Sequence, residues 1–249
     1  MTAMAMQKRR HTMDKTKIAL IGATGRIGKC IVELAQNHND MCVIMPLSRD
    51  ITRVWDAFAP VDIIIDFSHA EMTAEVAKRA LGKHIPLLIC TTGLTEDTKD
   101  ALKQCSKTCP VMIAPNTSIG ILVFRKMLES ATAIFDNAFD IDIVETHHRN
   151  KVDAPSGTAL SLKETVQSIR STPVGMHSIR AGDVIAEHVV SFRGDHETVK
   201  LTHTAHSRHV FADGALRLAK WLVKQKPGLY VPEDMCPDPV IASPKDVAI

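Results

Sequence analysis

A short apolar segment that ends in a glycine-rich turn places the strongest constraint on how this chain folds. Residues 17–21 read KIALI, a run typical of a strand buried in a parallel sheet. The turn that follows, residues 22–28, reads GATGRIG, and beyond it Ile31, Leu34 and Ala35 recur at helical spacing. A strand, a tight glycine turn and a helix in this order indicate the start of a βαβ unit.

The alternation of strand and helix continues through the first half of the chain. Thr95, with Thr98 three residues on, is a typical N-cap for one of these helices. Strands that alternate with helices build a parallel sheet with right-handed crossovers, so we predict an α/β fold with a Rossmann-like, doubly wound sheet. The further strands are expected at residues 41–45, 62–67, 87–91 and 111–114, and the further helices at 69–82 and 95–107.

The pattern changes after Asn116 and predicts a second, smaller α+β domain with a mixed sheet. The apolar runs 185–193 and 197–205 flank the turn Gly194-Asp195-His196, so we expect these two strands to pair antiparallel. The other elements expected here are helix 118–133, strand 140–146, helix 158–170 and a last helix over 213–226.

The charge balance and the cysteine pattern exclude several classes of protein. Lysine and arginine number 30 and aspartate and glutamate 28, a balance that does not suit a nucleic-acid-binding protein. No apolar run reaches the length of a membrane span, and we expect residues 1–16 to be a flexible extension. The six cysteines form no CxxC pair, which favours reduced thiols in a cytoplasmic protein.

The glycine-rich turn predicts a dinucleotide site. Its glycines, spaced GxxGxxG, let backbone N–H groups approach a pyrophosphate at the helix N-terminus. Ser48 and Arg49 follow the second strand, where NAD-binding proteins carry an acidic residue for the ribose 2′-hydroxyl. The Arg49 guanidinium suits a 2′-phosphate, which favours NADPH over NADH. Two alternatives stay open: Asp50 turns inward toward the ribose, or Arg49 is a solvated surface charge.

The chemistry-bearing side chains are densest in residues 145–159, which read ETHHRNKVDAPSGTA. His147 and His148 are able to exchange protons near neutral pH, and Lys151 adds a positive charge. The turn Ser156-Gly157-Thr158 opens a predicted helix, whose N-terminus favours anions. The segment therefore predicts a site for a small, multiply negative substrate that is protonated during the reaction.

The same segment resembles the signature of the 4-hydroxy-tetrahydrodipicolinate reductase family, also called dihydrodipicolinate reductases. Further motifs that resemble this family lie in order between residue 17 and about residue 229. They are GATGRIG, IIIDFSHAE, ICTTGLTED, IAPNTSIG, RAGDVIAEH and THTAHSRHVFADGALRLAKWL.

The resemblance implies a role for each matching residue. His147 is implied as the proton donor and Lys151 as the second catalytic residue. The residues implied to hold the substrate carboxylates are His148, Ser156, Gly157 and Thr158. The implied cofactor contacts are Gly22, Ala23, Thr24, Gly25, Arg26, Ile27, Ser48, Arg49, Cys90, Thr91, Thr92, Ala114, Pro115, Asn116, Thr117, Arg208 and Phe211. Thr117 departs from the family pattern, in which phenylalanine is frequent at this position.

The resemblance also implies a domain organisation and an activity. Residues 17–117 and 212–249 would form the dinucleotide-binding domain, and residues 118–211 the domain for substrate binding and oligomerisation, commonly as a homotetramer. The implied reaction is the NAD(P)H-dependent reduction of 4-hydroxy-tetrahydrodipicolinate in lysine and diaminopimelate biosynthesis. Hydride would reach the conjugated cyclic imine, and His147 or Lys151 would supply the proton.

Two other functions and a metal site are alternatives to this interpretation. A semialdehyde dehydrogenase needs an activated cysteine, for which Cys90 is the candidate, but nothing in the sequence marks a partner base. A non-enzymatic NADPH sensor would not require the His-His-Lys cluster. His203, His206 and His209 are three residues apart, so they alternate faces on a straight strand, and we expect no metal site.

Overall fold

The computed structural model describes residues 15–47 and 61–236 of the 249-residue chain. The predicted cofactor residues Ser48 and Arg49 lie outside the described residues. The described residues divide into two compact units. The first unit holds residues 15–22, 39–47, 61–115 and 217–236, and the second holds 23–38 and 116–216.

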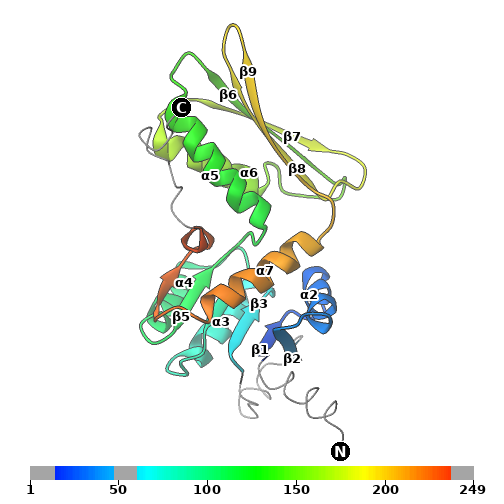
Figure 1. Ribbon diagram of the computed structural model, residues 1–249, viewed down its shortest axis with the longest axis vertical. Helices are drawn as coiled ribbons and strands as arrows, with labels where there is room; N and C mark the ends of the chain where they lie inside the picture. The colour runs from blue at the N-terminus through cyan, green and yellow to red at the C-terminus, as the bar shows by residue number, and fades with distance from the viewer. Residues whose placement is uncertain (1–14, 48–60, 237–249) are drawn as a thin grey trace, which may run out of the picture. The chain divides into compact units, whose positions relative to one another are not determined.

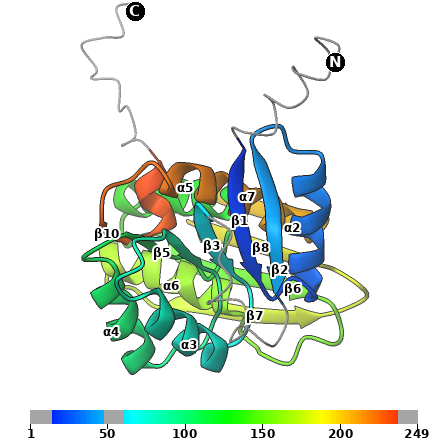
Figure 2. The same ribbon diagram turned by 90° about the horizontal axis from the view of Figure 1, so that it is seen from below.

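The first unit contains a six-stranded sheet in which every neighbouring pair is parallel (Figure 2). The strand order is β10-β5-β4-β3-β1-β2. The strands are β1 (Thr16–Ile21), β2 (Met41–Leu47), β3 (Ile63–Asp66), β4 (Leu87–Ile89), β5 (Pro110–Ile113) and β10 (Gly228–Tyr230). The Rossmann-like parallel sheet predicted from the sequence is thus confirmed, although β10, only three residues long, was not predicted.

The core of the first unit forms around central strands that are mostly apolar and fully buried. β3 and β4 are buried at every position, which is typical of parallel strands covered on both faces. Helices α3 (Ala70–Ala80) and α4 (Glu96–Cys105) contribute apolar side chains to this core. The expected N-cap of α4 is confirmed, since the Thr95 hydroxyl accepts a hydrogen bond of 3.2 Å from the Thr98 amide.

A 3-10 helix, η1 (Pro232–Met235), lies at the end of the described residues.

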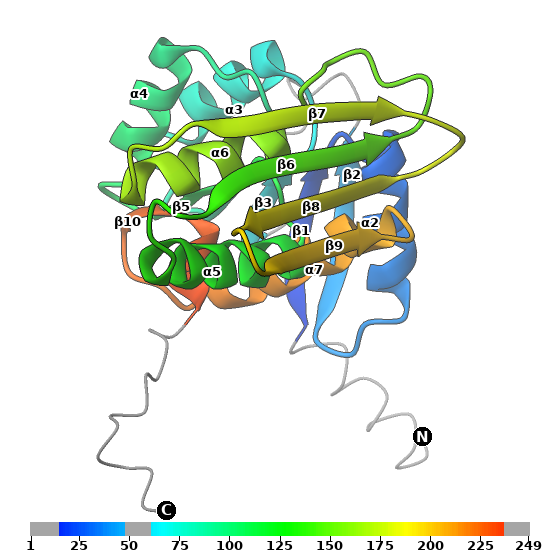
Figure 3. The same cartoon turned by 90° about the horizontal axis from the view of Figure 1, so that it is seen from above.

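The second unit contains a mixed four-stranded sheet in the order β7-β6-β8-β9. β6 pairs parallel with β7 and antiparallel with β8, and β8 pairs antiparallel with β9. The helices α5 and α6 cover one face of this sheet (Figures 1 and 3). The elements are α5 (Ile119–Ile134), β6 (Asp140–His147), α6 (Gly157–Ile169), β7 (Val174–Arg180), β8 (Ala186–Arg193) and β9 (Thr198–Ala205). The predicted mixed sheet and the β8–β9 hairpin are confirmed.

Two further elements differ from the prediction. β7 was not predicted, because its sequence VGMHSIR places polar or small residues among the apolar ones and lacks a strand-like run. The last helix, α7 (His209–Leu222), begins and ends four residues before the predicted bounds. Its earlier start follows from Ser207, whose hydroxyl accepts a 3.2 Å hydrogen bond from the amide of His209.

The turn between β1 and α2 (Arg26–Gln36) requires glycine at its first position. Gly22 has φ +80°, and a Cβ there would lie 2.3 Å from the carbonyl oxygen of Phe67. The backbone of this turn therefore lies directly against the segment that follows β3. Only a residue without a side chain allows this close approach.

Gly22→Ala is expected to destabilise the protein by about 2–5 kcal/mol, because backbone strain and overpacking add together. Gly82→Ala is the matched control, since Gly82 also has a positive φ, +75°, but nothing lies within 4 Å of its Cβ position. The control should cost only about 1–2 kcal/mol. Denaturant unfolding of both variants measures the difference, and equal losses would contradict the close approach at Gly22.

Candidate active site

The candidate site forms where the inner face of the mixed sheet changes from apolar to polar. Side chains of alternate residues on a strand share a face, so Ile143, Glu145 and His147 of β6 all point inward, and all are buried. The register pairs Ile143 with Val190 and Glu145 with His188 on the neighbouring β8. The apolar core therefore continues into a row of buried ionisable groups at the carboxyl end of β6.

Glu145 is the centre of this row and is fully buried. Both of its oxygens accept hydrogen bonds from Arg180: Oε1 from Nη2 at 2.7 Å and Oε2 from Nη1 at 2.9 Å. Oε1 also accepts from the Ser156 amide at 3.2 Å, and Oε2 contacts Nδ1 of His147. Burial raises the pKa of Glu145, but the bonds from Arg180 and His147 outweigh it and lower the pKa to about 2. The carboxylate is therefore ionised at neutral pH.

The protonation of His147 follows from this carboxylate. The imidazole is 7% exposed, and burial lowers its pKa although the charge of Glu145 raises it. An ionised carboxylate only accepts hydrogen bonds, so Nδ1 of His147 must be the donor toward Glu145. The Nε2 atom is then the ring nitrogen left to exchange a proton with a ligand.

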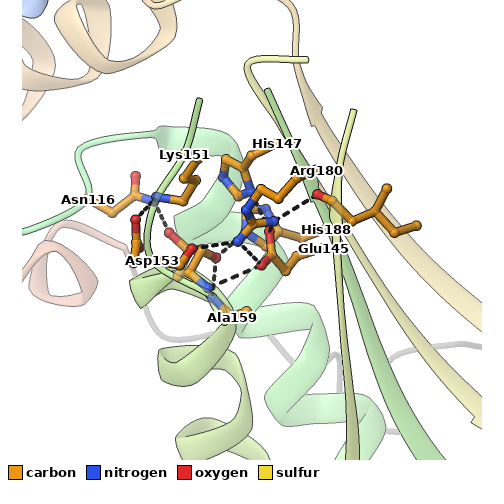
Figure 4. Close-up of polar contacts among 11 residues, drawn as sticks. Asn116, Glu145, His147, Lys151, Asp153, Ala159, Arg180 and His188 are labelled. Carbon is orange, nitrogen blue, oxygen red and sulfur yellow. Dashed lines mark hydrogen bonds and ion pairs between the residues drawn. The ribbon is translucent and has the colours of Figure 1, made fainter. Parts of the chain in front are cut away.

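Lys151 lies in the loop after β6 and is held close to the cluster (Figure 4). Its ammonium group donates a 2.8 Å hydrogen bond to Oδ1 of Asp153. Arg180 Nη2 donates to the backbone oxygen of Asp153 at 2.6 Å, so the same arginine holds Glu145 and this loop. The positive charge of Lys151 is near enough to contribute to the lowered pKa of His147.

The turn Ser156-Gly157-Thr158 forms the N-terminus of α6, as predicted. The Ser156 hydroxyl caps the helix by accepting from the Ala159 amide at 3.2 Å. The amides of Gly157 and Thr158 belong to the first turn and have no acceptor within the helix. Within Gly157–Ile169 the first turn holds no acidic residue. This arrangement suits a carboxylate ligand.

His188, which the sequence did not mark as a site residue, lies behind His147 and the helix cap. Its Nε2 atom is 3.3 Å from the Ser156 hydroxyl, and its ring meets that of His147 edge to face at 5.4 Å between centroids. Burial and the neighbouring charge of His147 lower the pKa of His188 to about 4. His188 is therefore a neutral, buried polar group at physiological pH.

His148 is not part of this cluster. It is the residue after β6, half-buried, and its side chain forms no hydrogen bond among the residues that the structure describes. Neighbouring residues of an extended chain point to opposite sides, which separates His148 from His147. The role implied for His148 in holding substrate stays a prediction.

The residues expected to hold the cofactor lie on several elements. Cys90, Thr91 and Thr92 follow β4, and Ala114 and Pro115 follow β5. Since β4 and β5 are parallel neighbours, both groups lie at the same edge of the sheet. The turn from Gly22 to Ile27 begins at the end of β1, which belongs to the same parallel sheet.

Cys90 does not have the surroundings of a catalytic nucleophile. Burial raises the pKa of its thiol well above the ordinary value, and the nearby carboxylate of Asp66 raises it further. A reactive cysteine requires the reverse, a thiolate stabilised by positive charge. This observation disfavours the semialdehyde dehydrogenase mechanism. All six cysteines lie in the described residues and are free thiols.

A further set of predicted cofactor residues is joined within the second unit. The Thr117 hydroxyl donates a 2.6 Å hydrogen bond to the backbone oxygen of Phe211, which follows Arg208 at the start of α7. A Cβ at Gly214 would lie 1.7 Å from the Thr117 carbonyl oxygen, so α7 touches this segment backbone to backbone. Asn116 Nδ2 donates to the Thr158 hydroxyl at 3.0 Å, which links a predicted cofactor residue to a predicted substrate residue.

Three residues of the cluster were missed from the sequence: Glu145, Arg180 and His188. Glu145 lies on the predicted strand 140–146 and His147 follows two residues later, so the alternation of side chains could have placed both on the same face. His188 alternates in the same way with Val190 in a predicted strand. Arg180 gave no such signal, because β7 itself was not predicted.

No group of three or more His, Cys, Asp or Glu side chains that could hold a metal ion occurs in residues 15–47 and 61–236. Over the same ranges, none of the helices has the length and apolar character needed to cross a bilayer.

The family models that match the chain cover nearly all of its described residues. Residues 16–117 match the model described as dihydrodipicolinate reductase, N-terminus, and residues 120–236 match the corresponding C-terminus model. The 4-hydroxy-tetrahydrodipicolinate reductase of Helicobacter hepaticus is 38% identical over 250 residues, covering 88% of this chain and 98% of that protein. The enzyme of the same name from Caldanaerobacter subterraneus subsp. tengcongensis is 33% identical over 248 residues, covering 88% and 97%.

A solved structure supports the fold. A dipicolinate-bound dihydrodipicolinate reductase from Paenisporosarcina sp. TG-14 matches with a TM-score of 0.78 and 21% identity, covering 89% of this chain and 100% of that one. At this level of identity, the likeness shows the architecture: a Rossmann-like parallel sheet with a second, mixed sheet.

The lowered pKa of His188 makes stability depend on pH. Its folded pKa of about 4 lies below the ordinary 6.5, so the unfolded chain takes up a proton first as the pH falls. Stability from this group is complete above about pH 6.5 and decreases by about 2–3 kcal/mol from about pH 7 to about pH 4.5. His188→Asn should remove that part of the decrease in denaturant unfolding at the two pH values. Equal decreases in parent and variant would contradict the buried neutral state of His188.

Proposed function

Because this chain belongs to the dihydrodipicolinate reductase family, and is thus an oxidoreductase of lysine and diaminopimelate biosynthesis, we propose that the buried cluster around His147 is its active site. The observation that carries this proposal is the juxtaposition of three groups. His147 directs Nε2 away from Glu145, Lys151 brings a positive charge nearby, and α6 presents the free amides of its first turn. Together they suit a small anion that must receive a proton.

The proposed substrate is 4-hydroxy-tetrahydrodipicolinate, a cyclic imine with two carboxylates. The dipicolinate-bound relative supports a small dicarboxylate ligand for this fold. In this chain, the amides of Gly157 and Thr158 would receive one carboxylate, with the helix dipole adding to the attraction. Lys151 and His148 are the positive or polar groups available to the other. Fixing both carboxylates orients the ring for reduction.

The proposed cofactor is a reduced nicotinamide dinucleotide, and the glycine-rich turn fits it. Gly22, with its positive φ, lets the turn follow β1 directly, and Gly25, the N-cap of α2, has no side chain that could occupy the amides of the first turn. Within Arg26–Gln36 the first turn holds no acidic residue, and Arg26 itself is positive. The amides at this N-terminus are thus available to the pyrophosphate. When bound, the nicotinamide supplies the hydride for the reduction.

The chain's own contribution to the chemistry is the proton. We propose that Nε2 of His147 carries it, since Nδ1 is committed to Glu145. The free imidazole has a lowered pKa because it is buried; a bound dianion would stabilise the imidazolium and raise that pKa toward neutrality. Lys151 would stabilise the negative charge that develops on the ring, or replace the proton on His147 after each turnover.

We further propose that the enzyme prefers NADPH, forms a homotetramer and is located in the cytoplasm. NADPH is favoured by Arg49, as argued from the sequence. The homotetramer is suggested by the resemblance, and reduced thiols fit a cytoplasmic enzyme.

His147→Gln should decrease turnover by about 10²–10⁴-fold, because it removes the proton donor. The Michaelis constant for the substrate should change little, since the amides of α6 are untouched. A spectrophotometric assay of NADPH oxidation, with the substrate generated enzymatically, measures both constants. His177→Gln is the matched control: His177 lies exposed on β7 of the same sheet, and its variant should keep normal turnover. Near-normal turnover in His147→Gln would remove His147 from its proposed role.

Arg49→Ala should raise the Michaelis constant for NADPH by about 10–100-fold and leave that for NADH almost unchanged. The reason is the loss of a charge-assisted hydrogen bond that only the 2′-phosphate accepts. The same assay with each cofactor tests this, with Arg79→Ala, a surface arginine of α3, as control. Equal responses to the two cofactors would refute the assignment of Arg49.

A further inference from the structure

We propose that Glu145 is a positioning residue whose two carboxylate oxygens align the proton donor and the seat for the substrate carboxylate at the same time. Oε2 faces His147, and Oε1 faces the start of α6 (Figure 4). This inference rests on the proposed function and extends it to a residue that does not itself touch the substrate.

One oxygen of Glu145 orients the imidazole of His147. Oε2 of Glu145 accepts from Nδ1 of His147 and also from Nη1 of Arg180. This bond fixes the orientation of the ring and the tautomer, because a carboxylate accepts and does not donate. It leaves Nε2 as the atom directed to the ligand. Glu145 thus determines which ring nitrogen of His147 exchanges a proton with the ligand. It also increases the affinity of the ring for that proton.

The other oxygen of Glu145 holds the start of α6. Oε1 of Glu145 accepts from the amide of Ser156 at 3.2 Å, and Ser156 in turn caps α6 through its hydroxyl. The amides of Gly157 and Thr158 directly follow. A shift of the Glu145 carboxylate would therefore move both the proton donor and the carboxylate seat, which a misplacement of about 1 Å is enough to impair.

Arg180 holds the carboxylate in this double role. Besides its two bonds to Glu145, its guanidinium donates to the backbone oxygens of Ile179 at 2.8 Å and Asp153 at 2.6 Å. The pair therefore joins β6, β7 and the loop that carries Lys151. A merely space-filling role would be met by an aliphatic side chain, as at Ile141 and Ile143 in the same row of β6.

The charged and titratable groups that face His147 come from four parts of the unit. The charged ones are Glu145 on β6, Arg180 on β7 and Lys151 in the loop after β6, and the fourth is the titratable but neutral His188 on β8. Glu145 is the negative charge among those that affect His147, and it favours the imidazolium. Its removal leaves two positive side chains acting on the ring, so the proton is lost at lower pH.

The test is the pH dependence of kcat in Glu145→Gln, measured with saturating NADPH. We expect kcat near neutral pH to decrease by about 10²-fold. The midpoint of the pH profile, the pH at which kcat has fallen to half its maximum on the basic side, should move about 1–3 pH units lower. The Michaelis constant for NADPH should not change. Glu145→Asp keeps the charge but shortens the reach, so it should restore the midpoint and only part of kcat. Asp142→Asn is the matched control: it removes the carboxylate of another arginine pair on β6, Asp142–Arg193, and should leave the midpoint unchanged.

The parent protein provides a second measurement that does not depend on a variant folding. Nitrogen-15 NMR of the histidine rings should show His147 protonated on Nδ1 at neutral pH, with His147→Gln used to assign the signal. A His147 protonated on Nε2 instead, or an unchanged kcat midpoint in Glu145→Gln, would overturn the positioning role. If His147→Gln itself keeps normal turnover, the proposed function fails; if only the midpoint is unmoved, the proposed function stands and this inference alone fails.

Discussion

The second unit is organised by the need to accommodate one ionised carboxylate in its interior. An isolated buried charge is strongly unfavourable, and even a paired one requires near-complete hydrogen bonding. Glu145 meets this requirement through donors from three elements: the guanidinium of Arg180 on β7, the imidazole of His147 on β6 and the amide of Ser156 before α6. Because the donors are so dispersed, the carboxylate can be satisfied only when strand register, helix start and loop are all in place. The stability of this region and the geometry of the candidate site therefore have one cause.

The core and the site are also continuous along the strands. On β6 and β8, the inward-facing row runs from Ile141 and Phe192, through Ile143 and Val190, to Glu145 and His188. The apolar end packs under α5 and α6, while the polar end lies at the N-terminus of α6. The register that buries the apolar pairs is the same register that brings the ionisable pair together, so a slip of one residue would turn both rows outward.

Most of the fold follows from the sequence because its elements carry strong local signals. The apolar runs of β1 and β3 and the glycine turn at Gly22 define the parallel sheet, and the motif around His147 defines the candidate site. β7 escaped prediction because its stability comes from pairing with β6, a tertiary effect that its own residues do not encode. The contact of Arg180 with Glu145 could not be predicted either, because Arg180 lies on β7. The orientation of His147 depends on that ion pair, so the sequence predicted which residue acts but not which of its nitrogens.

The contact at Gly214 restricts how this protein can evolve. Substitutions that disturb side-chain packing are often compensated by a change in the neighbouring side chain. At Gly214, however, the neighbour is the main-chain oxygen of Thr117, which is the same in all twenty amino acids. A mutation of a neighbouring side chain therefore cannot make room for a larger residue at position 214. The contact between α7 and the segment before α5 thus depends on glycine at this one position.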